Sequence, residues 1–546
     1  MKNFFLGAML FLSMLSFSQM KVEDSYSYKV SEPYKVFDAD EKHYFSRDNN
    51  SIAVKIDGRN IMIQKFDNEK PKFVSEKLYK EFLPKNGVIE EVYEFGNKYY
   101  IFYSSWDGGN VKREQLFAAE IDIEKGEFVS EPKRVFYIDG KVKGMAPNTI
   151  KYMNFNLRKF EFYRSHDKSK MLVKFSRIPE VKNDKKSNEI IGYKVLNFDL
   201  SVNSESEVKM PYTERIMENL DYQLNKNGDL FLLEKIFEDD SNKDRKSKKD
   251  DKPNYHLEIL TLKANAKEFQ TTKIDLKDKF INNLKFIDSP DDKMVFGGIY
   301  NSGSKDLDDA DGFVTFQLDK NFAVINKNFI EFPLELMNQY VSEKTAKKNE
   351  KKEAKEDEDG EGANIKNLVL RDLSLNPDGS IVLTSEVYNV IVHTYMTSSG
   401  TRTSYTYYYG SVYAAKIDSN GKLGWMKKIP KNQIGSRGRG GMSFQYLFNN
   451  NNHYVVFLDN VKNIDLPLNK FPARHSDGKG GYLTCVKIND KDGSVTKGSI
   501  LDVRGMEEFN LHQINMDRVF QSSENSFMME AYKKKKEDVM LKINLN

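Results

Sequence analysis

Short runs of Val, Ile, Phe, Tyr and Leu alternate with polar residues along most of the chain, and they end in turns rich in Asn, Asp and Gly. An alternation with a period of two is typical of a β-strand with one buried face. The clearest unit is 367–430, in which four such runs are joined by turns at 376–379 and 418–421 and by a longer insertion. The pattern predicts an all-β fold.

The order of strand, turn and strand recurs in about eight units, which begin near residues 43, 90, 158, 217, 280, 367, 443 and 511. The shortest spacing matches the ~40–50 residues of a four-stranded propeller blade. The last unit offers three strands, and the strand-like segment 26–37 belongs to no unit. We therefore predict a β-propeller of seven or eight four-stranded blades closed by the N-terminal strand, because closure removes sheet edges. Tandem β-sandwich domains are the alternative.

This periodicity, with its Asp-Gly and Asn-Gly turns, resembles that of uncharacterised secreted bacterial β-propeller proteins with degenerate blade repeats. The resemblance covers nearly all of the chain after residue 18. The resemblance implies a fold but does not imply an activity, because one fold serves many functions.

The N-terminus has the features of a secretory signal. Lys2 supplies a positive charge, 4–15 is an apolar run, and Ser16 and Ser18 precede a cleavage point before Gln19. The run is shorter than the ~20 residues that span a bilayer, although an uncleaved anchor is the alternative. We predict a signal peptide at 1–18 and a single propeller domain at 19–546. The protein is then exported, to the periplasm or the medium, with no transmembrane segment after cleavage.

Charge and cysteine content narrow the classes of partner. The 546 residues carry 84 Lys+Arg against 81 Asp+Glu, so a nucleic-acid partner is not expected. Cys485 is the only cysteine, so the chain forms no internal disulfide. It lies in an alternating strand pattern, where a buried core position is expected. We expect a monomer.

The long insertions follow a pattern. In a four-stranded meander, the loops between strands 2 and 3 project from the same face as the connections between blades. The insertions fall in these places, at 179–189, 238–253, 301–311, 333–364, 395–409, 435–441 and 460–480. Charged low-complexity sequence fills 238–253 and 343–364. Repeat proteins commonly bind through such a face, although drift of unconstrained loops is the alternative.

The insertion at 395–409 lies within the most unusual stretch. The second strand of its unit runs for ~17 steps, or about 56 Å, which predicts a protruding hairpin. Tyr395 lies near its tip, and the return strand carries Tyr405, Tyr407 and Tyr409 on one side and Tyr408 on the other. Exposed tyrosines suit contact with a protein or a sugar. The other interpretation is that the rings pair across the hairpin and hold it together.

Four residues in other predicted loops are further candidates for the binding site. Trp106 is placed to stack on a sugar, and Arg437 and Arg439, among glycines, are able to clamp an anion. An ordinary flexible connection is the alternative for the two arginines. His475 lies in a long loop, and we expect it at the surface.

We expect no cofactor and no metal ion, apart from one weak candidate for a calcium site. Asp306, Asp308, Asp309 and Asp311 precede a glycine, but Leu307 breaks the DxDxDG frame. No Cys/His ligand spacing is present.

These patterns favour an extracytoplasmic binding module that binds a protein or glycan through its loops. GxSxG is absent, so no local signature of a serine hydrolase supports an enzyme. The alternative is a hydrolase or lyase that acts on envelope glycans or peptides, with catalytic residues drawn from several blades.

Overall fold

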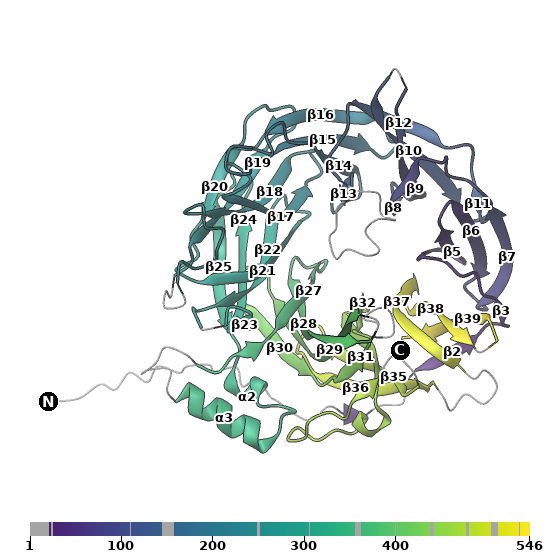
Figure 1. Ribbon diagram of the computed structural model, residues 1–546. Coiled ribbons are helices and arrows are strands. Elements are labelled where there is room, and N and C mark those ends of the chain that lie inside the picture. The colour runs from purple at the N-terminus through teal and green to yellow at the C-terminus, as the bar shows by residue number, and fades with distance from the viewer. Residues whose placement is uncertain are drawn as a thin grey trace.

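The computed structural model describes residues 21–22, 26–109, 111–144, 158–247, 252–304, 306–354, 362–398, 400–436, 442–476, 480–503, 511–533 and 535–545. Within them, eight sheets of four or more strands form a closed ring. The sheets are arranged radially around a central axis (Figure 1), and we number them as blades 1 to 8 along the chain.

The first four blades are antiparallel sheets whose strands follow one another in sequence. Blade 1 contains β4 (Glu41–Arg47), β5 (Asn50–Asp57), β6 (Asn60–Asp67) and β7 (Lys72–Tyr79). Blade 2 contains β8 (Gly87–Phe95), β9 (Lys98–Asp107), β10 (Arg113–Asp122), β11 (Glu127–Phe128) and β12 (Lys133–Asp139). Blade 3 contains β13 (Glu161–Arg164), β14 (Lys170–Ser176), β15 (Ile190–Asn197) and β16 (Val202–Lys209). Blade 4 contains β17 (Met217–Leu224), β18 (Leu230–Phe237), β19 (Tyr255–Leu262) and β20 (Gln270–Ile274).

The next three blades follow the same plan with additions. Blade 5 contains β21 (Phe280–Asp288), β22 (Met294–Asn301), β24 (Gly312–Leu318) and β25 (Val324–Glu331). Blade 6 contains β27 (Leu368–Leu375), β28 (Ile381–Thr397), β29 (Gly400–Ile417), β30 (Leu423–Ile429), β31 (Gln433–Gly435) and β34 (His475–Ser476). Blade 7 contains β32 (Gln445–Asn449), β33 (Asn452–Asp459), β35 (Tyr482–Asn489) and β36 (Val495–Asp502), with β1 (Lys21–Val22) parallel to β36.

Blade 8 joins the two ends of the described chain. It contains β37 (Leu511–Ser523), β38 (Ser526–Lys533) and β39 (Glu537–Asn544), with β2 (Ser27–Val30) and β3 (Tyr34–Lys35) both paired antiparallel to β39. Inner strands β37 and β4 then contact each other across the joint between blades 8 and 1. The predicted closure by the N-terminal strand is therefore confirmed.

The connection between blades 5 and 6 carries the helices. α2 (Leu334–Met337) and α3 (Glu343–Glu353) lie at the rim of the ring (Figure 1), beside the small pair β23 (Asp309–Ala310) and β26 (Ile365–Lys366). The side chain of Ser342 caps α3 by accepting a hydrogen bond from the amide of Thr345. Part of the predicted low-complexity segment 343–364 is thus helical, and no residue of α3 is buried. A further short helix of the 3-10 type spans Val461–Asn463.

The hydrophobic core is divided among the joints between blades. Each of eight clusters of buried apolar side chains combines residues from two neighbouring blades. Cys485 is among these buried residues, as the strand pattern predicted, and so is Trp425. The smallest cluster lies between blades 8 and 1 and contains Tyr34, Ala53, Phe66, Met528 and Met540. Strands therefore pack because their alternating apolar side chains face the next sheet.

Turn chemistry sets the strand ends. In the turn after β27, the amide of Gly379 donates to the carbonyl of Asn376 at 3.0 Å. Gly379 has a φ of +79°, a region that side chains other than glycine rarely adopt. The carboxylate of Asp378 accepts from the amide of Ser380 at 2.9 Å. These local bonds explain why the Asn-Pro-Asp-Gly sequence marks a strand boundary.

The propeller prediction is confirmed, with eight blades in the described residues, and the alternative of tandem sandwiches is wrong. The predicted signal peptide lies outside the described residues. Among the residues that the structure describes, no helix is long and apolar enough to cross a membrane.

Candidate functional site

The long insertions meet on one side of the ring, which we call the loop face. In the loops of blades 4 and 5, Arg245 donates to the carbonyl of Ser304 at 2.6 Å. The amide of Tyr340, in the connection after blade 5, donates to the carbonyl of Leu468 in the loop of blade 7 at 2.5 Å. The loops and the connections between blades thus contact each other across blade boundaries, as expected if they share a face.

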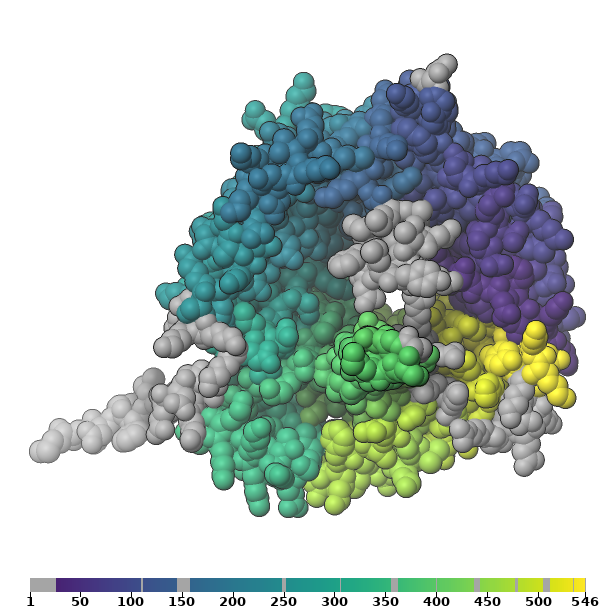
Figure 2. All heavy atoms as spheres, in the orientation of Figure 1, coloured from purple at the N-terminus to yellow at the C-terminus, as the bar shows by residue number. Residues whose placement is uncertain are grey.

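A two-stranded hairpin leaves blade 6 on the loop face. β28 and β29 pair from Ile381↔Ile417 to Thr397↔Gly400, with a bulge between Glu386 and Tyr388. We call residues 388–409 the hairpin, since they extend past the sheet. Figure 2 shows it in green at the front of the molecule. β31 pairs with β29 beside 407–409 and β34 pairs with β31, so only the base of the hairpin is widened.

The tyrosines of the hairpin divide into two groups. At the base, the rings of Tyr388 and Tyr409 lie 5.0 Å apart, and Tyr409 is buried. Nearer the tip, the rings of Tyr405 and Tyr407 are 6.4 Å apart, and Tyr395 and Tyr405 are 50% and 42% exposed. The tyrosine contacts therefore hold the base together, as one interpretation predicted. Farther out, Tyr395 and Tyr405 stay exposed, as the other interpretation requires; Tyr408 is half-buried.

Aliphatic side chains add to the exposed part of the hairpin. Ile391 and Val392 are neighbours on β28, so their side chains leave opposite faces of the ribbon, and both are exposed. Met396, close to the tip, is 90% exposed. The ribbon therefore presents apolar groups on both faces, and neither face packs on a core.

A cavity of about 420 Å³ lies beside the base of the hairpin. Its walls come from α2, α3 and the residues between them, from β26, from blade 6, and from Phe471 in the loop of blade 7. The apolar part of the wall consists of Met337, Tyr340, Val341, Ile365, Val387, Tyr413 and Phe471. Among the described residues no acidic side chain lines it, whereas five lysines do: Lys348, Lys352, Lys366, Lys428 and Lys431.

Two of the five lysines have a carboxylate partner. The buried Lys431 donates to Glu386 at 2.5 Å. That carboxylate is also buried and accepts from Arg371 and Ser443, both at 2.8 Å. The second, the exposed Lys366, lies 3.7 Å from Asp309. These two lysines therefore add little net charge to the cavity.

Lys428 is held differently. Its side chain is buried, and its ammonium donates to the carbonyls of Met337 and Gln339 at 2.9 and 2.6 Å. The ring of Tyr413 lies 5.6 Å away. Burial lowers the pKa of Lys428 to about 7. Among the described residues no carboxylate forms an ion pair with it, so its charge is solvated only by neutral dipoles.

α3 turns a polar face toward the cavity. Thr345, Lys348, Asn349 and Lys352 line it, and their spacing places them on one side of the helix. The side-chain amide of Asn349 donates to the side-chain carbonyl of Asn338 at 2.8 Å, which fixes the helix beside the connection after α2. A surface helix usually packs with an apolar stripe inward. Here the inward stripe carries two lysines instead.

Two predicted site residues lie away from the hairpin tip and the cavity. Trp106 is the penultimate residue of β9 in blade 2, with the ammonium of Lys141 5.5 Å from its ring. In a ring of eight, blade 2 is opposite blade 6. His475 begins β34 and is buried, so the expectation that it lies at the surface is wrong. Its amide donates to the carbonyl of Asn432, because the loop pairs with β31 as a strand.

The remaining candidates are not assembled into a site. Arg437 and Arg439 lie outside the described residues. Asp311 accepts from the amide of Ser302, and Asp309 pairs with Lys366. The described part of the chain holds no group of three His, Cys, Asp or Glu side chains arranged for a metal ion. The weak calcium candidates, which also include Asp306 and Asp308, thus do not converge.

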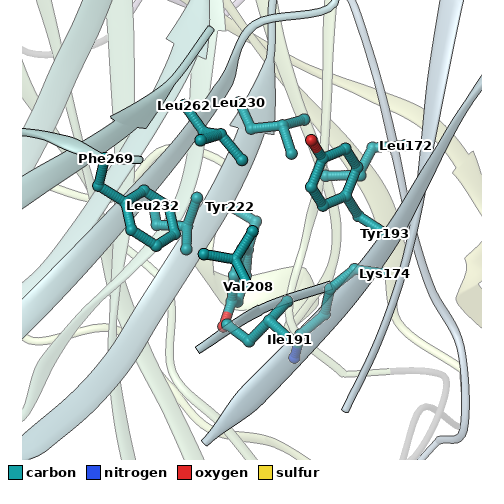
Figure 3. A pocket seen from close by; sticks show the side chains of 10 residues that line it. All are labelled: Leu172, Lys174, Ile191, Tyr193, Val208, Tyr222, Leu230, Leu232, Leu262 and Phe269. Carbon is teal, nitrogen blue, oxygen red and sulfur yellow. The ribbon is translucent and has the colours of Figure 1, made fainter. Parts of the chain in front are cut away.

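A second enclosed space lies between blades 3 and 4. Figure 3 shows apolar side chains, among them Leu172, Ile191 and Leu232, around a gap of about 10 Å³. Such a volume holds about one water molecule. It is a packing defect of the joint and no ligand site.

Sequence reasoning missed the lysine-lined cavity. Its lysines come from α3, from β26, from β30 and from the residues after it, so no short motif contains them. The only local signal is the i, i+4 spacing of Lys348 and Lys352 within a charged segment, which ordinary solvated helices share.

No family model and no curated protein matches the sequence. Solved structures that are similar to this chain include prolyl oligopeptidase B from Galerina marginata, at 8% identity and a TM-score of 0.38 over 93% of this chain. The match spans 55% of that protein. An uncharacterised protein from Listeria monocytogenes is 10% identical, with a TM-score of 0.36 over 83% of this chain and 94% of that one. The Dos1 propeller is 10% identical, with a TM-score of 0.32 over 63% of this chain and 64% of that one.

Proposed function

We propose that the protein is an extracytoplasmic binding propeller and that it holds a protein partner through the hairpin on the loop face. One observation carries the proposal. The hairpin extends past its blade and exposes apolar side chains on both faces, including Val392, Tyr395 and Met396. These side chains gain nothing from folding because they stay in water, whereas a partner would bury them.

The pairing of the strands supports a protein as the partner. A two-stranded hairpin with no core on either face is only marginally stable in water. Among the described residues, no strand pairs with the outer edge of 389–396, which therefore offers backbone donors and acceptors to a partner strand. An extended segment of a partner adds to such an edge by backbone hydrogen bonds. Export follows from the predicted signal peptide and is part of the proposal.

The test removes the hairpin and leaves the blade. Val390 and Tyr407 are register partners, so residues 391–406 are replaced by Asn-Gly, which closes a two-residue β-turn between them. The chain from Gln19 onward is used to capture partners from native envelope extract. A captured partner is then purified and titrated against both forms by calorimetry. We expect the shortened form to bind at least about a hundredfold more weakly, with an unchanged melting temperature.

A matched control carries Val74→Ser and Val129→Ser, which remove apolar side chains that are 50% and 55% exposed outside the hairpin. It is expected to bind like the unaltered protein. Equal binding by the shortened form would show that the partner uses another surface. Binding of a glycan alone would identify the wrong class of partner, and turnover of a glycan or peptide would favour the enzymatic alternative.

A further inference from the structure

We propose that the cavity beside α3 binds an organic anion, with an acidic group held by Lys428, Lys352 and Lys348 and an apolar body against the apolar side chains that line the cavity. This proposal goes beyond the function of the hairpin and does not depend on it. The cavity and the exposed part of the hairpin are made of different residues, so either site can exist without the other.

The first argument is the buried charge of Lys428. Its ammonium has three donors, and two of them bind the carbonyls of Met337 and Gln339. Buried charges in proteins are normally paired with an opposite charge. The neighbouring Lys431 follows that rule through Glu386, whereas Lys428 has no ion-pair partner in the described part of the chain. An acidic group in the cavity would supply both the missing charge and an acceptor for the third donor.

The second argument is independent and comes from α3. Lys348 and Lys352 line the cavity from the helix, and among the described residues neither has a carboxylate within ion-pair distance. Three lysines that form no ion pair within the described residues thus line one cavity, and none of the described lining residues is acidic. Mutual repulsion makes this arrangement unfavourable when the cavity holds only water. A bound anion reverses the sign of that interaction.

The volume and the wall define the ligand further. About 420 Å³ falls within the range of small-molecule sites and exceeds what a bare inorganic anion fills. Val341, Ile365 and Phe471 give the wall an apolar side, which favours an alkyl or aromatic body. The ligand class is therefore a carboxylate, sulfonate or phosphate ester with an apolar body. Free acids and the carboxyl end of a peptide share this chemistry.

A pair of fluorescent dyes tests the charge requirement on the full chain from Gln19. The probe is 8-anilinonaphthalene-1-sulfonate, an aromatic anion, and the matched probe is N-phenyl-1-naphthylamine, which has the same rings without the acid. We expect saturable binding of the anion at one site. The neutral dye is expected to bind at least about tenfold more weakly, because each charge-assisted hydrogen bond contributes substantially.

Variants on α3 locate the site without disturbing the core. Lys348→Glu with Lys352→Glu reverses the charge of the two lining lysines and is expected to weaken binding of the anionic dye by about tenfold or more. The matched control is Lys347→Glu with Lys351→Glu, the same change on residues of α3 that are exposed and do not line the cavity. It is expected to bind like the unaltered protein. Equal loss in both pairs would mean that only the overall charge matters and would overturn the proposal.

Lys428→Met tests the buried ammonium, with the melting temperature measured alongside. We expect a folded protein that loses at least about tenfold in affinity for the anionic dye and keeps its affinity for the neutral one. If this variant does not fold, the α3 pairs decide the question alone. Unchanged binding of the anionic dye to a folded Lys428→Met protein would refute the role of Lys428.

Competition separates the two sources of ligand. Octanoate is expected to displace the dye, and octanamide is not. A peptide that ends in a free leucine carboxylate displaces it only if the cavity is open to the end of a chain, and the amidated peptide serves as its control. Failure of both acids to displace the dye would show that the dye binds elsewhere and would overturn the proposal. Loss of the hairpin, by contrast, is expected to leave every one of these results unchanged.

Discussion

Two of the regions of the ring that bury lysines treat the charge in opposite ways. At the joint between blades 8 and 1, Lys55 is fully buried and forms an ion pair with Glu530, which is buried as well. In blade 6, the ammonium of Lys428 is buried against backbone carbonyls. The first lysine belongs to the closure of the ring, whereas the second faces a cavity.

The joint between blades 8 and 1 supplies the counter-charge of its buried lysine from within the fold. Glu530 also accepts from Tyr34 and Tyr44 at 2.9 and 2.8 Å and lies 3.1 Å from Lys42. Burial would raise the pKa of Glu530, but the charges of Lys55, Lys42 and Arg518 outweigh it and hold the pKa below its usual range. Because this joint has the smallest apolar cluster, polar contacts replace part of the hydrophobic packing.

The difference separates a structural charge from one that a ligand can use. A carboxylate that the chain itself supplies leaves no acceptor missing, so the site at Glu530 is complete once the ring has closed. The cavity beside α3 lacks that carboxylate among the described residues. A buried lysine alone therefore does not indicate a ligand site; what distinguishes the two sites is whether the chain supplies the counter-charge.

The largest expected effect comes from removing the counter-charge at the joint. Glu530→Gln keeps the shape of the side chain but leaves Lys42, Lys55 and Arg518 facing only Asp538. We expect a loss of about 3–5 kcal/mol in the free energy of unfolding, the usual result of breaking a buried pair. The measurement is urea unfolding followed by circular dichroism.

The matched control is Glu127→Gln, which breaks an exposed pair with Lys77. Its urea midpoint is expected to stay where it is, because water already screens that pair. If Glu530→Gln also leaves the midpoint unchanged, the charges at the joint are not what closes the ring.

The second effect is a pH dependence confined to Lys428. Its pKa is about 7 in the folded protein and near the ordinary lysine value of 10.5 in the unfolded chain. Between these values the unfolded state binds more protons, so stability rises with pH. We expect the unaltered protein to gain roughly 2–3 kcal/mol from about pH 7 to about pH 9 relative to Lys428→Met.

Urea unfolding of both proteins over this range gives the comparison, and other titrating groups cancel in the difference. Below pH 7 both states are protonated, so the difference is expected to be flat. If the difference in the free energy of unfolding is instead constant over the whole pH range, Lys428 keeps its charge in the folded protein. It would then have a counter-ion, as Lys55 has in Glu530, and the contrast between the two lysines would be wrong.

Much of the fold was predictable because strands and turns are local. Asn376 and Gly379 sit in one turn, and their hydrogen bond needs no partner from elsewhere in the chain. The length of β28 was likewise predictable from a long run of strand-forming residues, and the protruding hairpin was predicted from that length. The blade starts lie within a few residues of the predicted ones for the same reason.

The sites were not predictable in this way, since they depend on contacts between blades. Lys428 and Lys352 share a cavity only because the connection after blade 5 folds back over blade 6. His475 is buried because its loop pairs with β31, and no local sequence pattern predicts that contact. Lys55 and Glu530 meet only when the ring has closed.

The smallest expected effect measures a single hydrogen bond at the joint. Tyr34→Phe removes the donor to Glu530 and keeps the ring, which contacts Phe66 and Phe73 at centroid distances of 5.2 and 5.3 Å. We expect a loss of about 1.5 kcal/mol, as for a hydrogen bond to a charged group, measured by urea unfolding. Tyr137→Phe, in an exposed position, is the control and should not move the midpoint. If Tyr34→Phe costs as much as Glu530→Gln, the carboxylate depends on this hydroxyl more than on its lysines, and the contrast with Lys428 would concern hydrogen bonds rather than charge.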